Sequence, residues 1–128
     1  MKRAKEHIFQ LSESPLIILY KEGATTSIEL LNICFDELEK ITDQRPFNMI
    51  IDLSIARPPR TEVRHEIKSR FNTLNSEIES LSLIVGNNFI IKIAAQFVFR
   101  GMVKTKTTQL CKTVEIATEE IKKRYENR

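Results

Sequence analysis

The feature that most constrains this chain is the apolar run from Phe47 to Leu53. Apolar residues occupy consecutive positions in much of this run, whereas a strand with one solvent-exposed face alternates apolar and polar residues. Strands buried on both faces are typical of sheets that helices cover. The run therefore predicts an interior strand of an α/β domain.

Amphipathic helices are predicted on both sides of this strand. Before it, Thr26-Ser27-Ile28-Glu29 has the spacing of a capping box, which opens a helix that continues to about Ile41. After it, Pro58 and Pro59 interrupt regular structure, and a second helix is predicted from about Thr61 to Asn75. Apolar residues at steps of three and four give each helix one inward face, formed by Ile28, Leu31, Phe35, Leu38 and Ile41 in the first helix and by Val63, Ile67, Phe71 and Leu74 in the second.

The remaining segments continue the alternation of strands and helices. Two short strands, His7–Leu11 and Leu16–Lys21, are expected to pair as a hairpin around the turn Ser12–Pro15. The other expected elements are a strand at Leu81–Val85, a helix at Phe89–Met102 capped by Asn88, a strand at Thr107–Lys112 with Leu110 pointing inward, and a last helix capped by Thr113 with the stripe Ile116, Ala117, Ile121 and Tyr125.

The resulting element order, ββαβαβαβα, predicts the fold class. Strands that alternate with helices form largely parallel sheets with crossover connections, and the leading hairpin makes the sheet mixed. We therefore expect one α/β domain over residues 1–128, with a mixed, mostly parallel sheet of four to five strands flanked by helices. Its core is predicted to include Ile50, Ile51, Ile67, Phe71, Ile84, Ile93 and Phe97.

Composition narrows the expected partners and compartment. The formal net charge is +3, which is milder than nucleic-acid binders usually carry. No stretch approaches the ~20 apolar residues that span a bilayer, and the apolar run Leu16–Tyr20 is too short and too late for a signal peptide. Cys34 and Cys111 lie in apolar-patterned segments, which favours free thiols in a reducing compartment. These features predict a cytoplasmic protein that neither binds nucleic acid nor inserts into a membrane.

The chain has no recognisable pattern for catalysis, metal binding or cofactor binding. His65-Glu66 resembles the start of a zinc-protease helix, but Ser69 stands where the second histidine belongs. A catalytic cysteine–histidine pair is an alternative to core thiols, and core thiols are the favoured interpretation. A loop that cradles phosphate needs several glycines, and the chain holds only Gly23, Gly86 and Gly101. We therefore expect no enzyme activity, no cofactor, and no stoichiometric zinc or nucleotide.

Two features are candidates for a binding site. Asp52 ends the interior strand, at the kind of position where open α/β sheets gather ligands; the alternative is that it stabilises the adjacent turn. The second feature is a set of basic residues at steps of three and four, Arg57, Arg60, Arg64 and Lys68. They form either a docking patch for an acidic partner or anion, or a solvated face whose charge Glu62 and Glu66 compensate.

The order of strand, loop and helix around these candidates resembles a known superfamily. Met49-Ile50-Ile51-Asp52-Leu53-Ser54, followed by Pro58-Pro59-Arg60-Thr61-Glu62, is similar to the central segment of STAS domains. Leu83-Ile84-Val85-Gly86-Asn87-Asn88 and the helix after it resemble the SpoIIAA-like branch. The resemblance covers nearly the whole chain in element order. It implies a mixed sheet flanked by helices, no intrinsic enzymatic chemistry, and action as a protein-binding switch.

The resemblance also implies a candidate phosphoacceptor. In the switch members a kinase phosphorylates a serine or threonine at the start of the helix after the Asp-Leu-Ser strand, and Thr61 is at that position here. A helix N-terminus favours the added negative charge. The switch members have Asp-Ser-Ser-Gly where this chain has Arg60-Thr61-Glu62-Val63, so Thr61 lacks the Asp and Gly that flank the phosphoacceptor in those members.

Two interpretations of the function follow. The first is a regulatory protein-interaction module, with homodimer formation left open, that binds through the segment Ala56–Lys68. The second is a small-ligand or lipid-binding domain with a pocket between helices and sheet, lined by Phe89, Ile93 and Phe97. Neither interpretation identifies the partner or the ligand.

Overall fold

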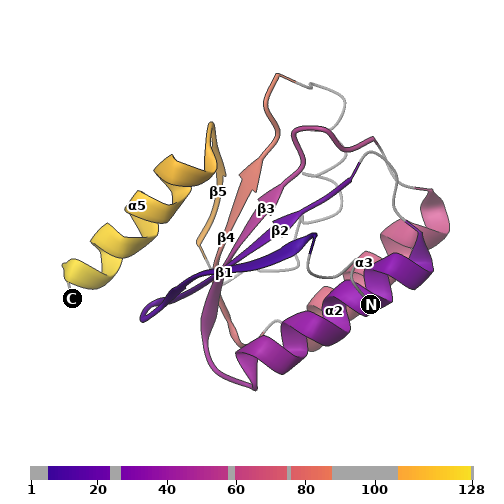
Figure 1. Ribbon diagram of the computed structural model, residues 1–128, viewed down its shortest axis with the longest axis horizontal. Coiled ribbons are helices and arrows are strands. Elements are labelled where there is room, and N and C mark those ends of the chain that lie inside the picture. Colours follow the sequence, from indigo (N-terminus) through magenta and orange to yellow (C-terminus); the bar gives the residue numbers. More distant parts are fainter. Residues whose placement is uncertain (1–5, 24–26, 58–59, 75, 88–106, 128) are drawn as a thin grey trace.

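The computed structural model describes residues 6–23, 27–57, 60–74, 76–87 and 107–127. Its elements, in chain order, are β1 (Ile8–Glu13), β2 (Leu16–Lys21), α2 (Ile28–Thr42), β3 (Phe47–Asp52), α3 (Thr61–Leu74), β4 (Ile78–Ile84), β5 (Thr107–Cys111) and α5 (Val114–Glu126). The strands form one sheet in the order β1-β2-β3-β4-β5 (Figure 1). β1 is antiparallel to β2, whereas β2–β3, β3–β4 and β4–β5 are parallel pairs. The expected α/β class with a mixed sheet is confirmed.

β1 and β2 form the expected hairpin. Its turn contains Ser14 and Pro15, which are joined by a cis peptide bond. The pairing shifts register between Gln10 and Ser12, so β1 is irregular at its centre. Arg45, which follows α2, donates a hydrogen bond of 2.8 Å to the Glu13 carboxylate and so ties the turn to the end of that helix.

Side-chain caps begin two of the helices. Ser27 is the N-cap of α2, because its Oγ accepts a hydrogen bond of 3.1 Å from the Leu30 N–H. The cap thus lies one residue after the Thr26 that a capping box would use. Thr113 caps α5 as predicted, with its Oγ1 accepting from the Ile116 N–H at 3.1 Å. Each cap satisfies one of the amides that a helix start leaves without an intrahelical partner.

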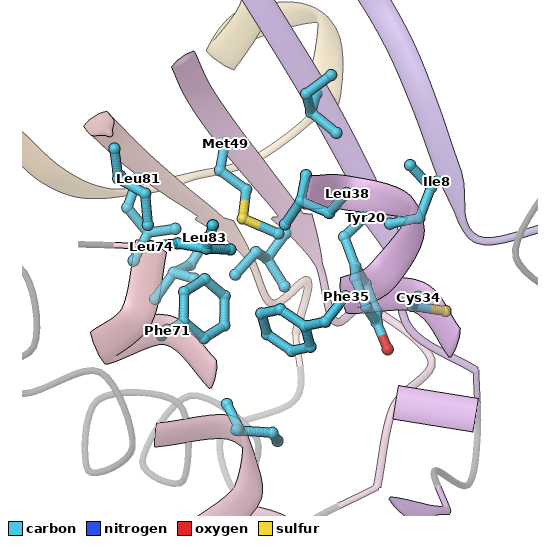
Figure 2. Close-up of a cluster of buried hydrophobic side chains, with 14 of the residues drawn as sticks. Ile8, Tyr20, Cys34, Phe35, Leu38, Met49, Phe71, Leu74, Leu81 and Leu83 are labelled. Carbon is cyan, nitrogen blue, oxygen red and sulfur yellow. The ribbon is translucent and has the colours of Figure 1, made fainter. Parts of the chain in front are cut away.

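Helices α2 and α3 lie on one face of the sheet and α5 lies on the other (Figure 1). The chain passes from β2 through α2 to β3, and from β3 through α3 to β4, moving in the same direction across the sheet. Two such crossovers of the same hand place their helices on the same face. The inner stripes of α2 and α3 therefore meet the sheet together in one large core. Phe35 and Phe71 face each other at its centre, with ring centroids 5.1 Å apart and an edge-to-face geometry (Figure 2).

The face under α5 has a smaller apolar cluster. Ile17, Leu19, Ile50 and Ile84 of the sheet meet Ala117 and Ile121 of α5. Of the predicted core residues, Ile50, Ile51, Ile67, Phe71 and Ile84 are buried, which confirms the helix and strand registers. Ile93 and Phe97 lie outside the described residues, as do the predicted helix Phe89–Met102, its cap Asn88, and Pro58 and Pro59.

Three residues that were predicted to face inward are exposed instead. Ile28 and Ile116 are 42% exposed, because they lie in the first turns of α2 and α5, where each helix has fewer neighbours to pack against. Leu110 is 41% exposed on β5, which lies at the edge of the sheet formed by the described strands. β4 also starts at Ile78, three residues before the predicted Leu81. Among the described helices, none is long and apolar enough to cross a membrane.

Candidate functional site

A cleft of about 400 Å³ opens where β2, β3, β4 and β5 end at the same edge of the sheet. We call it the strand-end cleft. Its apolar wall consists of Leu19 from β2, Ile84 from β4 and Val114 from the first turn of α5. The volume falls within the range of sites that hold small molecules. The carboxyl ends of parallel strands are also where α/β sheets most often place their ligands.

Asp52 reaches this cleft from the end of β3. Its Oδ1 accepts a hydrogen bond of 3.0 Å from the backbone N–H of Ser54, so the carboxylate stabilises the turn after the strand. The side chain is half-buried and also lines the cleft. The two alternatives given for Asp52 are therefore compatible, since one oxygen serves the turn while the carboxylate faces a cavity.

The loops after β3 and β4 approach each other closely beside Asp52. The Leu53 N–H donates to the Ile84 carbonyl at 2.7 Å, which continues the ladder one residue beyond β3. Gly86 has a positive φ of 60° and is close enough that an added Cβ would lie 3.6 Å from the Ser54 Cβ. A larger residue at Gly86 would be strained by this backbone conformation. Ser54 and Gly86 thus form a fixed corner of the strand-end cleft.

Charged side chains of both signs surround the strand-end cleft. Lys21 ends β2 and is the register partner of Asp52, while Lys112 and Glu115 flank Thr113 at the start of α5. None of the ion pairs found in the described part of the chain joins any two of these four residues. Two lysines and two acidic residues therefore line the cleft, and no ion pair within the described ranges links them to one another.

The predicted basic segment lies on a different element. Arg57 and Arg60 are exposed, and Thr61 is the exposed first residue of α3. The Arg64 guanidinium donates a hydrogen bond of 3.1 Å to the Thr61 hydroxyl, so these two predicted site residues are in contact. Lys68 is half-buried one turn further along α3.

The structure does not bring Asp52 and the basic residues into one site. Asp52 follows the side-chain direction of Ile50 and points toward the face that α5 covers, whereas α3 lies on the opposite face. None of Arg57, Arg60, Thr61, Arg64 and Lys68 lines the strand-end cleft. Ile55, in the loop between them, is 68% exposed, which was not predicted from the sequence.

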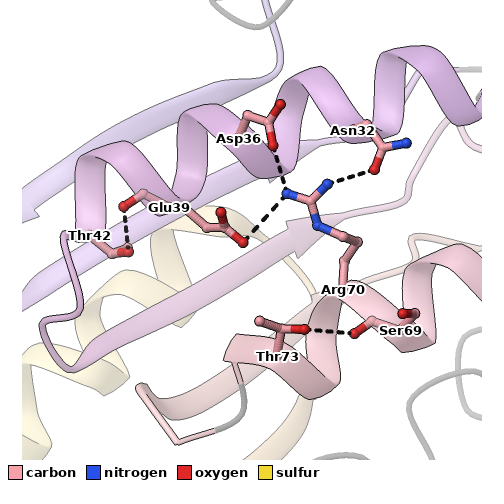
Figure 3. Close-up of polar contacts among 7 residues, drawn as sticks. All are labelled: Asn32, Asp36, Glu39, Thr42, Ser69, Arg70 and Thr73. Atoms are coloured by element: carbon pink, nitrogen blue, oxygen red, sulfur yellow. Dashed lines mark hydrogen bonds and ion pairs between the residues drawn. The ribbon is translucent and has the colours of Figure 1, made fainter.

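A polar contact between α2 and α3 was not predicted from the sequence (Figure 3). Arg70 donates to Asn32 at 2.6 Å, to Asp36 at 2.9 Å and to Glu39 at 3.5 Å, and its guanidinium stacks on the Phe35 ring at 5.1 Å. The only signal in the sequence is that the three acceptors recur at steps of three and four along one helix. Nothing in that spacing identifies the partner, because Arg70 is 31 or more residues away.

A buried polar network fixes α5 on the opposite face. The Asn48 amide donates to the Tyr125 hydroxyl at 3.0 Å and to the Leu16 carbonyl at 3.2 Å. The Ser80 hydroxyl donates to the Asn48 oxygen at 2.6 Å, and the Tyr125 hydroxyl donates to Glu79. Because buried polar groups cost free energy when they lack partners, this network specifies one position for the carboxyl-terminal part of α5.

Both cysteines are free thiols with raised pKa values. Burial is the main cause for Cys34, whose pKa rises to about 11, and the Glu22 carboxylate adds to the effect. Burial also raises the pKa of the half-buried Cys111, and the Glu120 carboxylate at 3.8 Å from its Sγ raises it further. A raised pKa lowers the thiolate fraction at neutral pH, which disfavours both residues as nucleophiles.

The sequence was compared with protein families and with curated proteins. No protein-family model matches the chain, and no curated protein matches it significantly. Within the described ranges, no three histidine, cysteine, aspartate or glutamate side chains are grouped as metal ligands would be. The candidate sites therefore depend on geometry and charge alone.

Proposed function

We propose that this chain is a non-enzymatic, regulatory protein-interaction module of STAS type, and that it binds an acidic partner through the start of α3. The observation that carries the proposal is Ile55, which is 68% exposed and lies in the same segment as the exposed Arg57 and Arg60. We call Ile55, Arg57, Arg60 and Arg64 the basic loop surface. A protein interface commonly combines an apolar anchor with arginine, so this pairing favours protein binding.

Both the apolar side chain and the arginines of the basic loop surface can contribute to the free energy of binding. Burying an isoleucine side chain contributes roughly 1.5–3 kcal/mol, and arginine forms charge-assisted bidentate contacts with carboxylates or phosphates. Lysine-like point charges alone would give weaker geometric selectivity. The partner that best matches the basic loop surface therefore has an interface of acidic groups around one apolar side chain.

The STAS assignment draws support from the element order. The described elements run ββαβαβ up to Ile84 and then βα from Thr107. A helix at Phe89–Met102, as expected from the sequence, would complete the order ββαβαβαβα. Thr61 is exposed at the first position of α3, as the family resemblance implies for a phosphoacceptor, and Arg64 is close enough to pair with a phosphate there. Two free thiols are consistent with a cytoplasmic location, which is part of the proposal.

Affinity capture from host lysate, with charge-reversed variants, tests the proposal. We expect the double variant Arg60→Glu and Arg64→Glu, and separately Ile55→Ser, to lose the partner that the unmodified chain retains. The melting temperature should stay nearly unchanged, since surface substitutions shift stability by about 0.5 kcal/mol or less. Lys40→Glu and Lys122→Glu, at exposed positions on α2 and α5, are the matched controls and should retain the partner.

The affinity of the purified partner for each variant then tests whether the basic loop surface is the binding site. With the captured partner purified, the Arg60→Glu and Arg64→Glu variant should bind about tenfold or more weakly, and added salt should weaken the unmodified pair. An unchanged set of captured proteins, or equal affinities for the double variant and the controls, would exclude the basic loop surface as the binding site.

A further inference from the structure

The residues paired across the carboxyl ends of β2, β3, β4 and β5 form an unusual set. Lys21, Asp52, Ile84 and Cys111 are successive register partners across β2, β3, β4 and β5. Three of these four residues line or adjoin the strand-end cleft, and Lys112 follows Cys111 directly. One side of the cleft therefore presents, in order, the positive Lys21, the negative Asp52, the apolar Ile84 and the positive Lys112.

The charges around the strand-end cleft balance. Lys21 and Lys112 contribute two positive charges, and Asp52 and Glu115 contribute two negative charges. In the part of the chain that the structure describes, neither lysine ammonium nor the Glu115 carboxylate has a hydrogen-bond or ion-pair partner. A ligand with a single charge could pair with groups of only one sign and would leave the charged groups of the other sign partly desolvated without a partner, which costs free energy.

From this pattern we propose that the strand-end cleft binds a small zwitterion, with an amine at one end, an acid group at the other and an apolar body between them. The amine lies against Asp52, whose carboxylate is held in place by the Ser54 N–H. The acid group lies against Lys112. The apolar body lies on Leu19, Ile84 and Val114. This inference involves none of the residues of the basic loop surface, so it goes beyond the proposed function and can fail independently of it.

The spacing of the strands sets the length of the ligand. Asp52 is on β3 and Lys112 follows β5, so about two strand spacings, roughly 10 Å in total, separate their backbones. Side chains that lean inward shorten the gap but do not close it. The amine and the acid of the ligand must therefore stand several ångström apart, which is farther than the two groups of an α-amino acid. Amino acids with a terminal amine on a linear chain, and dipeptides, meet this requirement.

A matched set of small molecules tests the charge requirement. The probes are ε-aminocaproate, which carries both charges, caproate, which lacks the amine, and n-pentylamine, which lacks the acid. Binding is followed by NMR, through the amide chemical shifts of Ser54, Gly86 and Val114 in the unmodified chain. We expect ε-aminocaproate to shift these amides in a saturable way and each single-charge probe to bind about tenfold or more weakly.

Conservative variants locate the two ends of the ligand. Asp52→Asn keeps a side-chain oxygen for the Ser54 N–H but removes the charge, and Lys112→Gln removes the opposite charge. Each should weaken ε-aminocaproate binding about tenfold, while Lys40→Gln and Glu119→Gln, which are exposed outside the cleft, should not. Amide spectra of each variant show whether it is folded.

Three outcomes would overturn the inference. The first is that neither ε-aminocaproate nor glycylglycine at millimolar concentration shifts the amides of the cleft. The second is that caproate or n-pentylamine binds as well as ε-aminocaproate, which would mean that one charge suffices. The third is that the Asp52→Asn and Lys112→Gln variants, with native amide spectra, bind ε-aminocaproate as the unmodified chain does.

Discussion

Two described helices, α2 and α3, cover one face of the sheet, whereas α5 is the described helix on the other (Figure 1). The first face has one continuous apolar core in which aromatic rings from both helices meet. The second has, among the described residues, a cluster of six buried apolar side chains and, beside it, the polar network of Asn48, Ser80 and Tyr125. The two faces of one sheet thus differ in both the amount and the chemistry of what they bury.

This difference separates stability from specificity. Burial of apolar area is non-directional and accounts for most of the favourable free energy of folding, so the α2–α3 face is the main source of stability. Hydrogen bonds are directional and costly when one partner is missing, so the network under α5 selects one docking position. The strand-end cleft opens on this second face, beside the first turn of α5.

The largest expected effect comes from truncating the aromatic centre of the first face. Phe71→Ala should reduce the free energy of unfolding by about 3–5 kcal/mol, through lost burial and the cavity left next to Phe35. Ile121→Ala, in the smaller cluster, should cost less, near the lower end of the ~2–5 kcal/mol typical of such truncations. Urea unfolding of both variants measures the difference. If Ile121→Ala reduces the free energy of unfolding more than Phe71→Ala does, the α2–α3 face is not the main source of stability.

A smaller effect is expected from the network on the second face. Tyr125→Phe removes the hydroxyl that accepts from Asn48 and donates to Glu79, while the aromatic ring stays in place. Leaving a buried amide proton without this partner should cost about 1–3 kcal/mol. Thermal and urea unfolding provide the measurement. A Tyr125→Phe variant as stable as the unmodified chain would show that the network does not fix α5.

The two cysteines report how tightly each face is closed. Cys34 is fully buried against the first core and has a pKa of about 11, whereas Cys111 is half-buried on β5 beside α5. Thiol reagents attack the thiolate, so burial and pKa both protect Cys34 more strongly. We expect Cys111 to be labelled about tenfold or more faster at pH 8. Single variants Cys34→Ala and Cys111→Ala assign the two rates, and equal rates would contradict the expectation.

The smallest effect is expected at the exposed pair of Glu13 and Arg45. The hydrogen bond from Arg45 lowers the pKa of the Glu13 carboxyl below its usual 4.5, with a second contribution from Gln10. Because the pKa is lower in the folded chain, the stabilisation is present above pH 4.5 and is lost as the pH falls through the folded value. Glu13→Gln should therefore be slightly less stable at pH 7 and equal to the unmodified chain at about pH 2. Urea unfolding at both pH values tests this sign.

Individual residues show how far sequence patterns reach. The stripe Val63, Ile67, Phe71 and Leu74 was predicted to be buried and is buried, since the helical period decides which side chains share a face. Thr113 was predicted as the cap of the last helix for an equally local reason. Leu110 was predicted to point inward and is exposed, because burial of an edge-strand side chain depends on what covers it.

The candidate sites likewise combine features set by local sequence with features set by tertiary packing. Asp52 was singled out from the sequence because the end of an interior strand is a local feature. Its neighbours in the strand-end cleft, Lys21, Gly86 and Lys112, are far from it along the chain, and only the parallel register brings them together. For the same reason, the contact of Arg70 with Asn32 and Asp36 has no signature that sequence spacing could reveal.

By itself, then, the sequence determined the type of nearly every described element, the inward stripes of α2 and α3 and the cap at Thr113, because propensity, period and capping act over a few residues. Tertiary structure alone decided that Asp52 points to the face of the sheet opposite α3 and that four strand ends form one cleft. The physical reason is that strand order, register and the face chosen by each crossover depend on packing between residues distant in the chain, which no local pattern contains.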